Sequence, residues 1–178
     1  MNKVYFNDMQ MEVLSIGAHD SVVVGGRGIG KGPVHAAVNL RNFQSMPGST
    51  TAFVAPNGKR ALTNTLPSMF QHWEDWGYKR GLHWVCGQKP PKNLHWAEPL
   101  IRPENYDNVI SFYTGAIGVI ISQDRIGTSN SKSFDFIDID EAKFIDFDRL
   151  KDETFQANRG QIKNFGHCPW HHGMLVTS

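Results

Sequence analysis

The chain has 178 residues, of which 40% are hydrophobic, and this size and composition suit one domain with a packed core. Its 18 basic and 17 acidic side chains leave a formal net charge of +1, which excludes a general attraction to polyanions and leaves nucleic-acid contact to local patches. No stretch approaches the roughly 20 apolar residues of a membrane helix, and the N-terminus lacks the apolar run of a signal peptide.

Helical and strand patterns alternate along the first half of the chain, which favours an α/β layered fold. The expected elements are a helix over 6–16 closed by a glycine, a buried β-branched strand over 21–24, a helix over 33–43, a strand over 50–54 and a long helix over 59–76. Pro33 is compatible with the second helix because it falls in the first turn, where no backbone N–H is needed.

The second half of the chain is richer in strands. The expected elements are a strand over 83–86, a surface loop over 87–94, strands over 108–113 and 118–122, a mobile polar loop over 123–133, a strand over 134–139, a helix over 147–158 and a strand over 174–178. The dipeptide Thr114-Gly115 indicates a hairpin or two close strands. We therefore expect a single domain over residues 1–178.

A glycine-rich segment joins the strand over 21–24 to the helix over 33–43, and its last glycines flank Lys31. The pattern Gly-x-x-x-x-Gly-Lys in this strand-to-helix context is typical of a phosphate-binding loop. Glycines let consecutive N–H groups surround phosphate oxygens, and a lysine can reach the outer phosphates. The alternative is a glycine-rich turn with a solvated lysine. The candidate nucleotide-binding residues are Gly25, Gly26, Arg27, Gly28, Ile29, Gly30, Lys31 and Gly32.

The loop departs from the usual pattern at its last position. Where a Ser or Thr hydroxyl normally helps to hold Mg²⁺, this chain has Gly32. The metal would then need a water molecule or another side chain at that coordination position. The sequence therefore supports nucleotide binding more strongly than turnover.

The second candidate motif is the acidic end of the strand over 134–139. Asp140 is expected to bind the Mg²⁺ that bridges the phosphates, and Glu141 to orient and polarise the attacking water. Lys31 and Glu141 are thus the first candidate catalytic residues, and ATP and Mg²⁺ the expected cofactors. Taken alone, an Asp-Glu pair after an apolar strand also fits a solvated acidic loop.

The remaining acidic residues of this region have weaker signals. Asp138 alternates with Asp140 and so shares its face of the strand, which makes it a candidate for a supporting or structural carboxylate. Asp135, Asp146 and Asp148 are expected at solvated ends.

With both motifs placed, the sequence resembles the N-terminal ATPase domain of phage terminase large subunits. The segments that carry the resemblance are Phe6-Asn7-Asp8-Met9-Gln10, Gly25-Gly26-Arg27-Gly28-Ile29-Gly30-Lys31, Ser122-Gln123-Asp124-Arg125, Ile139-Asp140-Glu141-Ala142 and Leu175-Val176-Thr177-Ser178. Their order, spread over almost the whole chain, is more specific than any one motif. The resemblance implies a P-loop NTPase of the ASCE type, with an α/β three-layer sandwich around a mostly parallel central sheet.

The resemblance also implies roles for single residues. Gln10, with Phe6 nearby, matches an adenine-reading glutamine whose amide can donate to and accept from the base. Arg125 matches a catalytic arginine finger that acts on a neighbouring subunit. Arg27, inside the phosphate loop, matches an arginine that terminases also carry there, and it is the alternative candidate for a sensor arginine. Thr177 and Ser178 match the motif that couples hydrolysis to DNA movement.

The partners implied by the resemblance are double-stranded DNA, the portal, the small terminase subunit and further copies of the chain in a ring on the capsid. The expected location is the cytoplasm of an infected bacterial host. A full terminase continues into a nuclease domain, so we expect a fragment with reduced ATPase activity. The alternatives are a helicase-like DNA-repair ATPase and a nucleotide-binding fragment without turnover.

Four further features of the sequence give weaker predictions. Cys86 and Cys168 are expected as free thiols. The segment 167–172 contains histidines and a cysteine, but its spacing fits no familiar zinc pattern, so packing is favoured over metal binding. The tryptophans are expected in the core and in helix packing. The basic clusters at 79–80 and 89–92 are expected on solvated surface.

Overall fold

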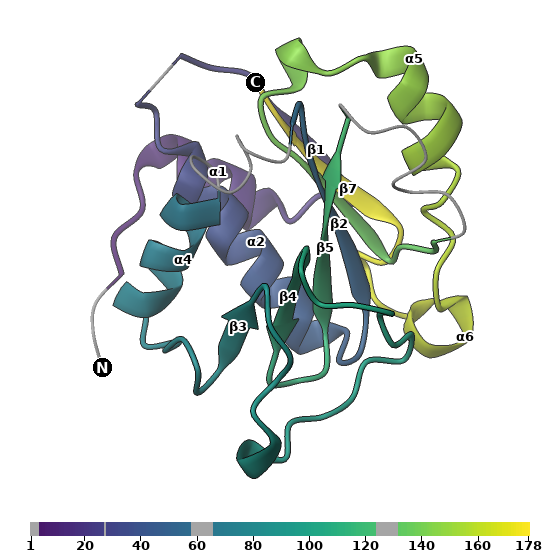
Figure 1. Ribbon diagram of the computed structural model, residues 1–178. Coiled ribbons are helices and arrows are strands. Elements are labelled where there is room, and N and C mark those ends of the chain that lie inside the picture. Colours follow the sequence, from purple (N-terminus) through teal and green to yellow (C-terminus); the bar gives the residue numbers. More distant parts are fainter. Residues whose placement is uncertain (1–3, 27, 58–65, 124–131) are drawn as a thin grey trace.

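The computed structural model describes residues 4–26, 28–57, 66–123 and 132–178 (Figure 1). The strands within these ranges are β1 (Asp20–Val23), β2 (Thr50–Ala55), β3 (Trp84–Cys86), β4 (Val109–Phe112), β5 (Ile117–Ser122), β6 (Phe136–Ile139) and β7 (Gly173–Thr177). They form one sheet in the order β1-β7-β6-β2-β5-β4-β3. The first five strands of this order, β1-β7-β6-β2-β5, pair in parallel, and β4 is antiparallel to its neighbours β5 and β3.

Helices cover both faces of the sheet. The helices are α1 (Asp8–Ile16), α2 (Lys31–Ser45), α4 (Leu66–Asp75), α5 (Phe147–Arg149) and α6 (Ile162–Phe165), with short helical turns η2 (Lys92–Leu94) and η3 (Ala142–Phe144) and the π-helical η4 (Leu150–Phe155). Figure 1 shows α1, α2 and α4 on one side of the sheet, and α5 and α6 on the other. The α/β three-layer fold with a mostly parallel sheet is therefore confirmed.

Alternation along the central strand explains the two layers. Phe53 and Ala55 of β2 pack with the aromatic core under α2 and α4, while Ala52 and Val54 pack with the core that contains Leu150 of η4. Successive side chains of a strand point to opposite faces, so a strand that is apolar throughout needs cover on both sides. All six residues of β2 are buried.

The large aromatic residues fix how α4 lies on the sheet and on α2. Trp73 is fully buried, its ring lies edge-on to Phe43 and Phe112, and its indole N–H donates to the carbonyl of Ala36 at 2.9 Å. Edge-to-face packing of rings at these separations is favourable beyond the area buried. The carboxyl-terminal half of α4 is thereby held against the first half of α2.

Several predicted boundaries shift in the structure. The second helix begins at Lys31, inside the glycine-rich loop, rather than at Pro33. The helix predicted over 147–158 is a single turn, α5, followed by π-helical η4. The predicted helix over 59–76 and the predicted loop over 123–133 are described only in part, because 58–65 and 124–131 lie outside the described residues. The hairpin prediction is confirmed, with the turn between β4 and β5 at Gly115, where φ is 81°.

The prediction of a buried first strand is wrong. β1 lies at the edge of the sheet and pairs only with β7 among the described strands, so Val22 is 70% exposed. Val24, beyond the strand's end, is 78% exposed. A β-branched run reports strand propensity, which does not distinguish an edge strand from a central one.

Asp135 is also misplaced by the sequence prediction, since its carboxyl is buried rather than solvated. One oxygen accepts from the backbone N–H of Thr50 at 2.8 Å, and the other lies 3.1 Å from Nε2 of His171. The 167–172 segment therefore contributes His171 as a polar partner for Asp135, the residue just before β6. Cys168 is buried beside Met46 and is a free thiol, in agreement with the packing prediction. In the described part of the chain, no helix is both long enough and apolar enough to cross a membrane.

Replacing Asp135 by Ala should lower the free energy of unfolding by about 2–3 kcal/mol, because the N–H of Thr50 would lose its buried acceptor. Asp148→Ala is the matched control, since Asp148 is exposed, and it should change stability by less than about 0.5 kcal/mol. Urea unfolding followed by circular dichroism measures both. Equal effects of the two substitutions would contradict the structural role of Asp135.

Candidate functional site

The glycine-rich loop and the acidic strand end open into one cavity of about 550 Å³. It lies where the parallel strands β1, β7 and β6 end, which is the edge of an α/β sheet where ligands bind. The residues that line it are Gly25, Gly26, Gly28, Ile29, Gly30, Lys31, Gly32, Pro33, His35, Ser68, His72, Asp140, Glu141, Lys143 and Ser178. The two motifs, far apart in sequence, therefore share one cleft.

The loop itself is closely packed at Gly30. Its φ of 90° is unfavourable for any residue with a side chain, and a Cβ there would lie 2.2 Å from Nε2 of Gln10. Lys31 folds back over the loop, and its ammonium group donates to the carbonyls of Gly25 at 2.9 Å and Gly26 at 3.1 Å. Lys31 thus lines the cavity, and a phosphate group could replace the two carbonyls as acceptors of its hydrogen bonds.

The start of α1 holds the far side of the loop. Asn7 caps the helix and donates through its side chain to the carbonyl of Ile29 at 3.0 Å. The amide of Gln10 donates to the carbonyl of Gly30 at 2.9 Å and accepts from the N–H of Asn7 at 2.9 Å. Gln10 is buried, so both ends of its amide are engaged with the protein in this state. Adenine reading by Gln10 stays a prediction and would require these bonds to change.

The end of β7 lies between the two motifs, because β7 separates β1 from β6 in the sheet. The carbonyl of Ser178 accepts from the N–H of Gly25 at 2.9 Å, which joins β7 to the loop. The hydroxyl of Thr177 donates to the carboxylate of Asp140 at 2.7 Å, which joins β7 to the acidic motif. Thr177 and Ser178, the predicted coupling residues, therefore contact both halves of the site.

A buried polar network beneath the cavity connects α2 to β6 and β7. Nδ1 of His35 lies 2.6 Å from Asp138, and its Nε2 lies 2.9 Å from the hydroxyl of Thr177. The amide of Asn39 donates to the second oxygen of Asp138. Asp138 is 2% exposed, so its role in the structure is to anchor this network. The network positions Thr177 and, through it, Asp140.

The protonation state of His35 follows from these contacts. The hydroxyl of Thr177 gives its one proton to Asp140 and so accepts from Nε2 of His35, while Nδ1 faces the carboxylate of Asp138. Only an imidazolium ion donates from both ring nitrogens. Burial alone would lower the pKa of His35, but the carboxylates of Asp138 and Asp140 together raise that pKa to about 10. A buried cation, the imidazolium of His35, therefore borders the cavity beside Asp140.

The backbone places the two carboxylates of the acidic motif differently. Asp140 Oδ1 accepts from the N–H of Glu141 at 2.8 Å as well as from Thr177, so the Asp140 side chain is fixed at the end of β6. Glu141 has a φ of 55°, the left-handed conformation that a residue with a side chain seldom adopts. Such a conformation is sustained only when the surrounding structure requires it, and here it turns the chain at the cavity wall.

The oxygen donors of the cavity fit a magnesium ion. Mg²⁺ is held in proteins by one or two carboxylates together with substrate phosphates and water, and Asp140 and Glu141 supply carboxylates on one wall. Over the ranges that the structure describes, no cluster of three or more His, Cys, Asp or Glu side chains is arranged to hold a metal. A dedicated protein cage for zinc is thus not found there, and the 167–172 segment forms none.

Four polar residues of the cavity were missed in the sequence analysis, namely His35, Ser68, His72 and Lys143. His35 follows Lys31 by four residues in one helix, a spacing that places both on the same face and could have been noticed. Ser68 and His72 come from α4, whose approach to the loop depends on tertiary packing. The predicted residues Arg27 and Arg125 lie outside the described residues.

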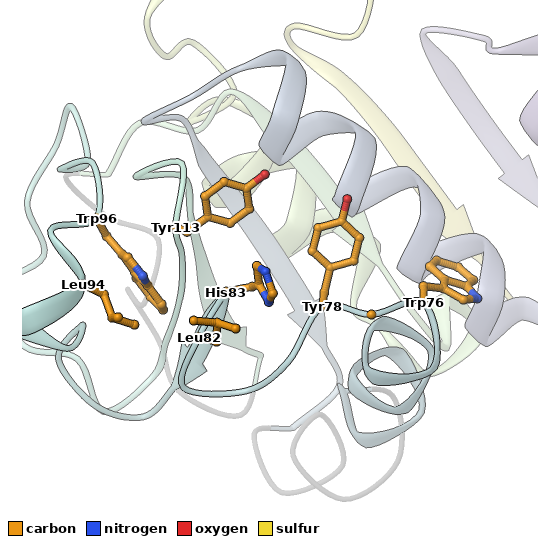
Figure 2. Close-up of a pocket in the computed structure, with 8 residues that line it drawn as sticks. Trp76, Tyr78, Leu82, His83, Leu94, Trp96 and Tyr113 are labelled. Atoms are coloured by element: carbon orange, nitrogen blue, oxygen red, sulfur yellow. The ribbon is translucent and has the colours of Figure 1, made fainter. Parts of the chain in front are cut away.

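A second cavity of about 620 Å³ lies beside β3 and β4, and none of the residues that line it borders the loop cavity (Figure 2). Figure 2 shows the ring of His83 between those of Tyr78 and Tyr113, with Trp76 and Trp96 farther out. No carboxylate, lysine or arginine is among the described residues that line it, so it does not suit a magnesium-bound triphosphate. Trp73 and Trp84 are buried and Trp76 packs, half-buried, against the same core, as predicted. Trp76 also lines this groove, together with Trp96.

Comparisons with known proteins agree with the fold. Two similar solved structures are the ATPase domain of the large terminase of Thermus phage P74-26 and a variant of that domain with one arginine replaced by alanine. The TM-scores are 0.58 and 0.57, with 15% and 16% sequence identity over 98% of this chain. The chain spans 64% and 65% of the length of those chains. No protein-family model and no curated protein matches it. The resemblance predicted from the sequence is thus confirmed at the level of the fold.

The contacts of Gln10 lead to a test of its role. If Gln10 acts by holding the carbonyl of Gly30, Gln10→Ala should weaken ATP and GTP binding by the same factor, about tenfold for the loss of a buried hydrogen bond. An adenine reader would instead lose affinity for ATP alone. Competition of both nucleotides against a fluorescent analogue separates the two cases, with exposed Gln71→Ala as the control for folding.

Proposed function

We propose that this chain is an ATPase module of the terminase type, which binds Mg-ATP in the loop cavity and hydrolyses it. The observation that carries the proposal is the convergence of Lys31, Asp140 and Glu141 on one cavity at the carboxyl edge of the parallel sheet. Phosphoryl transfer to water depends on positioning and charge stabilisation, which this arrangement can supply. The similarity in fold to a phage terminase ATPase domain supports the same assignment.

The roles of the residues follow from their chemistry. The N–H groups of the loop would bind phosphate oxygens at the start of α2, where the helix dipole favours an anion. Lys31 would leave the carbonyls of Gly25 and Gly26 and donate to the outer phosphates. Asp140 would hold the magnesium ion, which when bound neutralises charge between the β- and γ-phosphates.

Glu141 would then orient the attacking water. The carboxylate accepts a hydrogen bond from the water, whose oxygen attacks the γ-phosphorus as the bond to ADP breaks. Thr177 bonds to the carboxylate of Asp140, while Ser178 borders the cavity. A change at the γ-phosphate could therefore reach the end of β7 through one hydrogen bond, which supports the proposed coupling role of these two residues.

The biological setting that we propose is DNA packaging, with several copies of the module moving double-stranded DNA into a capsid. The portal and the small terminase subunit are the partners expected in that setting. The near-neutral charge of the chain means that DNA contact would depend on local patches or on other parts of the assembly.

Nucleotide binding without turnover is a second candidate function, favoured by Gly32. This residue supplies no hydroxyl to the metal at the position where the loop pattern has Ser or Thr. A module of this kind would bind nucleotide but release no phosphate.

Substitution of the two charged residues separates these candidates. Lys31→Ala should weaken ATP binding by about tenfold or more, because it removes a charge-assisted contact to phosphate. Glu141→Gln keeps the size of the side chain and should lower turnover by about 10²–10³-fold with little change in binding. Phosphate release and equilibrium binding measure the two effects, and a wild-type chain that binds ATP but releases no phosphate would favour the second candidate.

The arginine-finger prediction for Arg125 can be tested by mixing variants. Arg125→Ala alone and Glu141→Gln alone should each be nearly inactive. If Arg125 acts on a neighbouring subunit, a mixture should recover part of the activity, since an intact Glu141 in one copy meets an intact Arg125 from the other. Phosphate release from mixtures at several ratios is the measurement, and absence of recovery at every ratio would count against action in trans.

A further inference from the structure

We propose that the hydroxyl of Ser68, from α4, takes the place of the missing phosphate-loop hydroxyl and binds the magnesium ion of the nucleotide. This inference rests on the proposed function, because it assigns a further ligand to the same site. It concerns the one position at which the loop departs from the usual pattern, Gly32.

The space beside Gly32 is occupied by Ser68. A Cβ built on Gly32 would lie 2.4 Å from Oγ of Ser68, closer than non-bonded atoms approach. The side chain that a Ser or Thr would carry at position 32 therefore overlaps the hydroxyl that α4 already supplies. Ser68 and Gly32 both line the loop cavity, together with Asp140 and Glu141.

The packing of α4 fixes where Ser68 lies. The buried face of the helix carries Leu66, Met69 and Trp73, and Trp73 donates to the backbone of α2 at Ala36. Ser68 is exposed, on a part of the helix that borders the loop cavity. An oxygen donor held on a packed helix is placed as reproducibly as one on the loop itself.

The chemistry favours Ser68 over its neighbour in the same place. Nε2 of His72 is 3.8 Å from the position of a Cβ on Gly32, farther than Oγ of Ser68, and imidazole is a poor ligand for Mg²⁺. A serine hydroxyl is a neutral oxygen donor, the same kind of ligand that the usual loop residue offers. With glycine at position 32 and serine at position 68, the hydroxyl donor is kept, but α4 carries it in place of the loop.

The test measures how much magnesium strengthens nucleotide binding. A fluorescent ADP analogue is titrated into the chain with Mg²⁺ and again with EDTA, and the ratio of the two affinities is the magnesium gain. Ser68→Ala should reduce this gain by about tenfold, as expected for loss of a metal ligand's contribution. Affinity in EDTA should not change, which also verifies that the variant is folded.

A swap of the two residues provides the sharper control. In Gly32→Ser/Ser68→Ala the new side chain has room, because Cβ of residue 68 lies 3.5 Å from the position of a Cβ on residue 32. This double variant should regain the magnesium gain, whereas Gly32→Ala/Ser68→Ala, which fills the same space without a hydroxyl, should not. Gly32→Ser alone should weaken binding, since two side chains would compete for one place.

The outcomes distinguish this inference from the proposed function. A wild-type magnesium gain that Ser68→Ala leaves intact would overturn the role of Ser68 and leave the nucleotide site standing. Recovery of the gain by the alanine double variant would also overturn it, because filling space would then be sufficient. A wild-type chain that binds no nucleotide under either condition would overturn the proposed function and this inference together.

Discussion

The position of β7 between β1 and β6 is the constraint on which the rest of the site depends. Parallel pairing on both sides brings the end of β7 to the same edge as the glycine-rich loop and Asp140. One bond from Gly25 to the carbonyl of Ser178 and one from Thr177 to Asp140 then link the two halves. The cavity thus depends on strand order, because β7 is the element that is hydrogen-bonded to both the loop and the acidic motif.

The polar network below the cavity gives that edge a fixed geometry. His35, Asn39 and Asp138 are all buried, and each has a hydrogen-bonded partner on another element. Breaking a buried charge pair costs several kcal/mol because it leaves one charge without compensation, so such a network resists rearrangement. It supports Thr177 from beneath while Asp140 faces the cavity, so the fold itself holds these residues of the candidate site in place.

The sequence was sufficient to predict the features that depend on residues close together in the chain. The strand-to-helix context of the glycine-rich loop, the acidic strand end and the hairpin at Thr114-Gly115 are each read from neighbouring residues, and the fold agrees with all three. It was insufficient where two distant segments decide the outcome. The burial of Asp135 depends on His171, the exposure of Val22 on strand order, and the meeting of Ser68 with Gly32 on how α4 packs against α2. None of these pairings leaves a periodic or compositional trace.

The folded-back lysine has a consequence for selectivity. Because the ammonium of Lys31 already has two carbonyl acceptors, an arriving ligand exchanges one set of acceptors for another and does not capture a bare cation. A carbonyl is a dipole and a phosphate oxygen carries formal charge, so the exchange is favourable in proportion to the ligand's charge. Neutral or weakly charged molecules would gain little by entering, and increasing ionic strength would diminish the advantage of the highly charged ones. The hydrogen bonds of Lys31 within the loop would therefore favour ligands that carry several negative charges.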